Sequence, residues 1–160
     1  MKLNGSKASS HRCLKNFNKM RPLGIDFGAS RIGVAISDEL GMLAHPLETI
    51  PNDDAFLPKL QKIVLKKGIS VIVVGIPRNM DGSYGPAAEK AKLFMSQLKT
   101  EFPGLQLVAW DERLTTLEAQ RLLHAAGRDV KKSRPVIDQV AAQVILQSYL
   151  DSVAMAGETE

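Results

Sequence analysis

Residues 23–38, LGIDFGASRIGVAISD, contain two short apolar runs separated by a glycine-containing turn. Residues 23–27 and 32–37 are rich in β-branched and other apolar side chains, and their spacing predicts a β-hairpin. One carboxylate, Asp26, interrupts the first run, although a charged side chain rarely lies unpaired in a buried strand. Gly24 and Gly28 flank it closely and permit close approach of another chain or of a phosphate group. The segment therefore predicts two strands of a sheet and one candidate functional residue.

The rest of the chain alternates strand patterns with helix patterns. Further elements are expected in this order: a strand within 41–50, a helix from Asp53 or Asp54 to Gly68, a strand over 69–77, a helix over 86–100, a strand over 105–110, a helix entered at Thr115 or Thr116 and ending near 127, and a helix over 135–154. Three strands that can pair as hairpins, followed by alternating strands and helices, predict an α/β fold with a mixed sheet. We expect a ribonuclease H-like mixed five-stranded sheet flanked by helices.

The length of 160 residues, with 44% hydrophobic residues, suits one domain. We expect that domain over 21–154, preceded by a disordered or mis-assigned extension over 1–20 and followed by a flexible tail over 155–160. The extension holds five of the 21 basic residues and no acidic residue, so 16 basic and 17 acidic residues are left in the body. Any basic surface for nucleic acid must therefore be local.

The cysteine content and the hydropathy pattern indicate where the protein works. Cys13 is the one cysteine of the chain, so no internal disulfide can form and a reducing compartment is indicated. No apolar run approaches the roughly twenty residues that a membrane span needs. The sequence predicts a cytoplasmic protein without a membrane segment.

Acidic residues fall at three places that the predicted topology brings toward one edge of the sheet. Asp26 lies on the first strand, Asp111 and Glu112 directly follow the last strand, and Asp138 lies in the first turn of the final helix. Each is an ordinary turn or cap residue by itself. Three converging carboxylates would repel one another unless a divalent cation neutralised them, and oxygen ligands suit Mg²⁺ or Mn²⁺. The pattern therefore predicts a metal site for such ions.

Four segments together resemble one family. They are GIDFGASRIGVAISD (24–38), VGIPRNMDGSYG (74–85), DERLTT (111–116) and IDQVAAQVILQSYLD (137–151). Their order and separations are similar to the motifs of the YqgF family of Holliday junction resolvases and pre-16S rRNA nucleases. The resemblance covers the body of the chain.

The resemblance implies a ribonuclease H-like nuclease that hydrolyses phosphodiesters with divalent metal. It carries the catalytic and metal-binding roles onto Asp26, Glu112 and Asp138, with Asp26 bridging two ions. Where some related resolvases carry a further acid, one turn into the last helix, this chain has Ala141 or Ala142.

Other residues are candidates for supporting or substrate-binding roles. Asp111 is expected to support the site or cap a helix rather than to bind metal directly. Nucleic-acid contacts are expected from cations and one aromatic side chain: Arg31, Arg113, Lys131, Lys132, Arg134 and Tyr84. The alternative for Arg31 and Arg113 is an ion pair with a neighbouring acid. The alternative for the basic loop is an ordinary solvated charge run, and for Tyr84 it is packing.

The substrate expected from the resemblance is pre-16S rRNA or branched DNA. Symmetric cleavage of a four-way junction would require two active sites and therefore a homodimer. A non-catalytic RNA-binding or transcription-associated module of the same fold is an alternative function. A nucleotide-binding ATPase is a weaker one, since proteins of that kind enclose the nucleotide between two such domains and 160 residues supply one.

Overall fold

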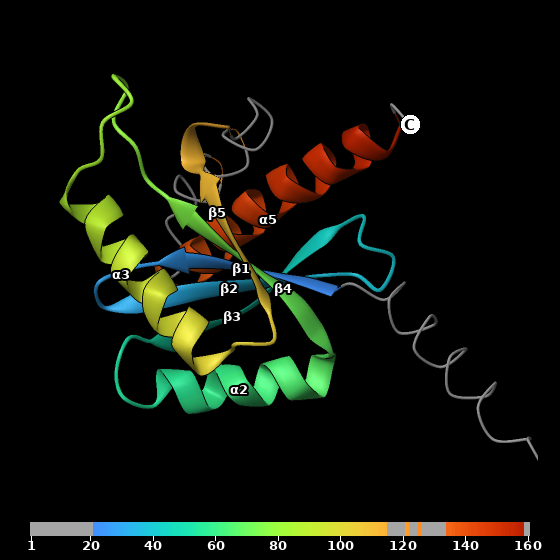
Figure 1. The fold of residues 1–160 in the computed structure, drawn as a ribbon, viewed down its shortest axis with the longest axis horizontal. Helices are drawn as coiled ribbons and strands as arrows, with labels where there is room; N and C mark the ends of the chain where they lie inside the picture. Colours follow the sequence, from blue (N-terminus) through green and yellow to red (C-terminus); the bar gives the residue numbers. More distant parts are fainter. Residues whose placement is uncertain (1–20, 115–120, 122–124, 126–133, 159–160) are drawn as a thin grey trace, which may run out of the picture.

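The computed structural model describes residues 21–114, 121, 125 and 134–158. Five strands form one sheet in the order β3-β2-β1-β4-β5 (Figure 1). Their bounds are β1 (Arg21–Phe27), β2 (Arg31–Ser37), β3 (Ala44–Pro51), β4 (Ile69–Ile76) and β5 (Gln106–Asp111). β1 pairs antiparallel with β2 and β2 antiparallel with β3, whereas β1–β4 and β4–β5 are parallel. The expected mixed five-stranded sheet is confirmed.

Three α-helices and one short 3-10 helix are described. They are α2 (Phe56–Lys67), α3 (Pro86–Glu101), α5 (Arg134–Glu158) and the 3-10 helix η1 (Glu112–Leu114). α2 ends because Gly68 adopts a left-handed backbone with φ 66°, and its N–H bonds to the Val64 carbonyl. α3 begins at Pro86, whose missing N–H costs nothing in the first turn of a helix.

The alternation of side chains along the strands divides the core between the two faces of the sheet (Figure 1). The face that carries Leu23 and Ile25 packs with residues of α2 and α3, including Leu60 and Phe94. The opposite face is covered by α5 and carries smaller residues. Its buried cluster contains Ala35, Ala44, Val71, Val73, Ala142, Ile145, Leu146 and Leu150.

The close packing of α5 depends on glycines in the strands beneath it. A Cβ atom on Gly24 would lie 2.7 Å from the Cβ of Leu146, and one on Gly33 would overlap the carbonyl oxygen of Asp138. At Gly24 the close approach is therefore made by α5 of the same chain, rather than by another chain or a phosphate. At Gly28 the neighbour that an added Cβ would meet is the carbonyl of Arg31, within the β1–β2 turn.

Some boundaries differ from those expected from sequence. The last helix continues to Glu158 instead of ending near 154, so residues 155–158 are helical rather than a flexible tail. Met155 and Ala156 favour helix, and no proline interrupts this end. The extension over 1–20 and nearly all of the helix expected before 127 lie outside the described residues. Within the described ranges, none of the helices has the length and apolarity that crossing a bilayer requires.

Candidate active site

Asp26 lies near the end of β1, on the face of the sheet that α5 covers. Leu23 and Ile25 point to the opposite core, so the two-residue period of the strand turns Gly24 and Asp26 toward α5. The cross-strand partner of Asp26 is Gly33 on β2. Because Gly33 has no side chain, the backbone of α5 packs directly on this position of the sheet.

That contact places Asp138 beside Asp26. Asp138 lies in the first part of α5, and both its carbonyl oxygen and its Cβ lie against Gly33. A glycine in β2 therefore decides how near the third carboxylate comes to the first. The sequence pattern placed Asp138 at a helix start but could not show which strand the helix crosses.

Glu112 reaches the same face from the other side. In β5, Val108 and Trp110 pack against the α5 cluster, and Glu112 comes two residues further along at the start of η1. One oxygen of Glu112, Oε1, lies 2.8 Å from where a Cβ on Gly75 would lie, and Ile145 of α5 is its neighbour there. Gly75 of β4 thus leaves the space that the Glu112 side chain occupies.

The charges of these acids interact in a partly buried environment. The pKa of Asp26 is raised from its ordinary 3.8 to about 7, first because the carboxyl is withdrawn from water and then because Glu112 and Asp138 lie nearby. Burial also raises the pKa of Glu112, with a further contribution from Asp111. Both shifts mean that the charged forms of these acids are disfavoured, because the surrounding protein does not compensate their negative charge.

The donor set has the chemistry of a site for a hard cation, since all three acids offer oxygen. The carboxylate of Asp26 makes no hydrogen bond or ion pair within the described residues. As the side chains stand, however, no three acidic, histidine or cysteine residues in those ranges converge closely enough to hold an ion. Asp138 Oδ2 instead accepts a hydrogen bond of 3.0 Å from Arg31 Nε. The three acids therefore share an electrostatic environment without sharing a coordination point.

At the helix position where some related resolvases carry a further acid, this chain has an alanine that packs against β1. Ala142 is fully buried, and its carbonyl oxygen lies 3.0 Å from where a Cβ on Gly24 would lie. A carboxylate at 142 would have to displace the helix from β1. Ala141 is partly exposed on the same turn.

The two arginines near the acids make ion pairs in this structure. Arg31 pairs with Asp138, and Arg113 pairs with Asp111 through Nη2 at 2.8 Å and Nε at 3.1 Å from Oδ2. Asp111 also accepts a bond of 2.9 Å from the Arg113 backbone N–H at the start of η1. Both arginines thus make ion pairs, and the carboxylate of Asp111 caps the start of η1.

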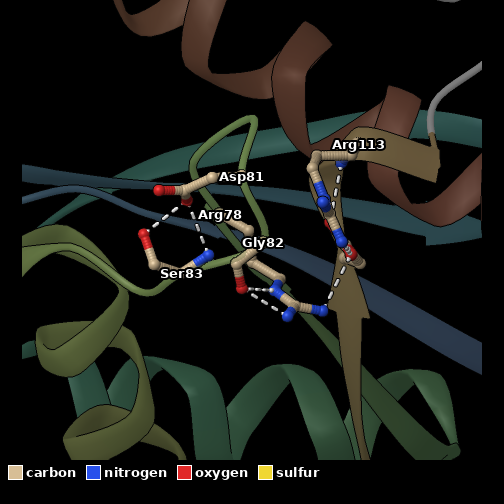
Figure 2. Close-up of polar contacts among 6 residues, drawn as sticks. Arg78, Asp81, Gly82, Ser83 and Arg113 are labelled. Carbon is tan, nitrogen blue, oxygen red and sulfur yellow. Dashed lines mark hydrogen bonds and ion pairs between the residues drawn. The ribbon is translucent and has the colours of Figure 1, made fainter.

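Arg78 is a residue that the sequence reasoning did not single out. Its guanidinium donates to the Gly82 carbonyl, as Figure 2 shows. Its Nη1 atom lies 3.4 Å from Asp111 Oδ2. Arg78 comes directly after the buried strand and Pro77. This position could have marked it as a candidate site residue, because side chains at the carboxyl ends of parallel strands gather at one edge of the sheet.

The remaining predicted contacts are only partly described. Tyr84 is 44% exposed, and its ring lies under the Lys92 ammonium, 3.4 Å from the ring centroid. Lys131 and Lys132 lie outside the described residues, as does the side chain of Arg134.

A mixed sheet in this strand order, with acids gathered at the end of its first strand, defines a ribonuclease H-like protein. Solved structures of that fold align over most of the chain. Thermus thermophilus RuvC in complex with a Holliday junction substrate aligns with TM-score 0.58 and 13% identity over 85% of this chain and 96% of that one. The fowlpox virus resolvase with Holliday junction DNA aligns with TM-score 0.50 and 12% identity over 84% and 99%. These likenesses establish the fold.

The chain belongs to the RuvX family, described as Holliday junction resolvase, whose model matches residues 20–152. Relatives from Geobacillus kaustophilus and Listeria innocua are 52% and 44% identical to it over 137 residues. Each alignment covers 83% of this chain and 99% of the relative, and both relatives carry the name "Putative pre-16S rRNA nuclease". The resemblance inferred from the four motifs is confirmed.

Proposed function

We propose that the protein is a divalent-metal-dependent nuclease that hydrolyses phosphodiester bonds of nucleic acid. The observation that carries the proposal is the gathering of Asp26, Glu112 and Asp138 on one face at one edge of the sheet. Burial and mutual repulsion of these acids raise the pKa of Asp26, which is the electrostatic condition that a bound cation relieves. Membership of a resolvase family agrees with this chemistry.

The residues that would hold Mg²⁺ or Mn²⁺ are these three acids, with Asp26 between the other two. When bound there, a divalent cation would lower the pKa of a water for attack on phosphorus and would stabilise the leaving oxygen. For Asp138 to take part, its carboxylate would have to share or leave its bond with Arg31. Arg31 would then have a free guanidinium edge to donate to a phosphate of the substrate.

Asp111 would act by holding Arg113 and the start of η1, so that Glu112 stays directed toward Gly75. Substrate contacts are assigned to Arg31, Arg113 and Tyr84, and to the basic segment that contains Lys131, Lys132 and Arg134. The phosphate backbone is the feature that such side chains recognise.

The substrate we propose is the 5′ extension of a 16S rRNA precursor, a four-way DNA junction, or both. The relatives are named for the first and the family for the second. A monomer is sufficient for the RNA cut, whereas paired cuts in a junction require two copies of the chain. We place this activity in the cytoplasm, where both substrates occur in bacteria.

Cleavage of both substrates by the purified protein tests the proposal. Labelled pre-16S rRNA and labelled four-way junction are incubated with Mg²⁺ or Mn²⁺, and the wild type is compared with Asp26→Asn, which removes a ligand with little change of volume. Asp54→Asn, which removes an exposed carboxylate on the opposite side of β1, is the matched control.

We expect metal-dependent cutting of at least one substrate, lost in Asp26→Asn and retained in Asp54→Asn. Full activity of Asp26→Asn would refute the site. Binding of nucleic acid without any cutting by the wild type would favour the alternative of an RNA-binding module. Light scattering of the protein with the junction distinguishes one copy from two.

A further inference from the structure

The loop over 77–85 leaves the sheet between the strands that carry two of the acids. β4 lies between β1 and β5, and all three are parallel, so their carboxyl ends meet at one edge. Asp26 lies near the end of β1, and Glu112 directly follows β5. A strand of nucleic acid bound between these acids would therefore pass the loop that follows β4 (Figure 1).

The tip of this loop is a closed turn held by its own contacts. The backbone N–H of Asn79 donates to the Ser83 carbonyl, and that of Gly82, with φ 87°, donates back to the Asn79 carbonyl. Asp81 Oδ1 accepts from the backbone N–H of Ser83 at 2.9 Å and from its hydroxyl at 2.6 Å (Figure 2). All of these contacts lie within 79–83, so none of them ties the turn to the sheet.

Arg78 provides an anchor with three of its guanidinium contacts. Nε and Nη2 donate to the Gly82 carbonyl at 3.1 and 2.5 Å, and Nη1 lies 3.4 Å from Asp111 Oδ2. The Cζ atom also lies 4.5 Å from the centre of the Tyr84 ring. One side chain thus connects the tip of the loop, its last aromatic residue and the end of β5.

Asp111 does not depend on Arg78 for its own position. It accepts hydrogen bonds from the backbone N–H and the guanidinium of Arg113, at distances from 2.8 to 3.2 Å. Removing Arg78 would therefore release the loop while the turn that carries Glu112 stays in place.

We propose that Arg78 is a positioning residue that holds the 77–85 loop against the end of β5, where the loop forms part of the surface that contacts the substrate backbone. The substrate part of this proposal rests on the nuclease function, whereas the anchoring itself does not. A single ammonium cannot reproduce the forked contacts, so Arg78→Lys keeps the charge and loses the anchor.

Arg78→Lys is compared with Arg21→Lys as the matched control. Arg21 also donates to two carbonyls, those of Ser37 and Lys67, but at the opposite end of the sheet. Hydrogen exchange followed by mass spectrometry reports the anchor directly. We expect amides of 79–84 to exchange about tenfold faster in Arg78→Lys and unchanged in Arg21→Lys, with α5 protected equally in both.

Steady-state cleavage reports the consequence for substrate. We expect KM to rise about tenfold in Arg78→Lys, the equivalent of one charge-assisted hydrogen bond, with kcat within about threefold of the wild type because the Glu112 turn is retained. A merely structural defect would lower the fraction of active enzyme, and thus kcat, without changing KM.

Unchanged exchange of the loop would overturn the anchoring role. Faster exchange with unchanged KM would overturn the substrate-contact role, as would a fall in kcat alone. If the wild type cuts neither RNA nor DNA, the nuclease proposal fails, and Arg78 is then judged by Kd for the same labelled nucleic acids. Binding about tenfold weaker in Arg78→Lys supports the surface, and equal binding refutes it.

Discussion

At the scale of single residues, Asp26 has the most unusual environment among the described acids. Its pKa is raised to about 7 by burial and by Glu112 and Asp138. Near pH 4 and below, the carboxyl binds its proton in both folded and unfolded chains. Between about pH 4 and pH 7 the folded chain retains a proton that the unfolded chain has released, so stability falls as pH rises through that range.

We predict that metal-free Asp26→Asn is more stable than the wild type at about pH 8, by up to about 4 kcal/mol, and that this difference disappears near pH 4. Asparagine cannot ionise and so avoids the cost of a buried charge. Urea unfolding in EDTA at both pH values measures the difference, with Asp54→Asn as control. A constant difference across pH would show that ionisation of Asp26 does not limit stability.

At the scale of elements, the position of α5 depends on glycines as well as on the apolar side chains of its buried cluster. Gly24 and Gly33 lie on adjacent strands, and each faces the backbone or the Cβ atoms of the helix. The contact at Gly33 also brings Asp138 to the site, so packing and chemistry depend on the same residue.

We predict that Gly33→Ala destabilises the protein by about 1–3 kcal/mol and lowers cleavage, because its Cβ would overlap the backbone carbonyl of Asp138. Gly104→Ala is the matched control, since a Cβ there meets no atom within 4 Å. Thermal unfolding and cleavage of both variants provide the measurement. Equal stability and equal cleavage of the two variants would show that α5 can move away from Gly33 with little loss of stability.

At the scale of the whole molecule, the body of the chain is close to electrically neutral, with 16 basic and 17 acidic residues beyond the first twenty. Attraction for nucleic acid must then come from local groups rather than from a general positive field. Three arginines near the acids, Arg31, Arg78 and Arg113, form ion pairs with them. These ion pairs reduce the number of guanidinium N–H groups that can bind a phosphate of the substrate.

We predict that replacing Lys131 and Lys132 together by alanine weakens nucleic-acid binding and flattens its salt dependence. The slope of log K against log salt should fall by about one for each lysine that contacts a phosphate. Fluorescence anisotropy over a series of salt concentrations measures it. The control is the double replacement of Lys59 and Lys62, which are exposed on α2. Identical slopes for the two variants would show that Lys131 and Lys132 are solvated and do not contact phosphate.

Sequence patterns predicted the local features well, because strand alternation, glycine stops and proline starts are encoded by neighbouring residues. The hairpin around Asp26, the end of α2 at Gly68 and the start of α3 at Pro86 are examples. The end of α5 was placed too early, because no local signal marks where a helix of good formers stops.

The sequence by itself therefore determined the order of the elements, the kinds of acid available and the family. Only the tertiary structure decided the partners of those residues. Arg31 and Asp138 are 107 positions apart, and Arg78 and Asp111 are 33 apart, so their pairing depends on how α5 and β5 pack on the sheet. Such contacts arise from the fit of whole surfaces, in which Gly33 and Gly75 set the distances, and no spacing along the chain records that fit.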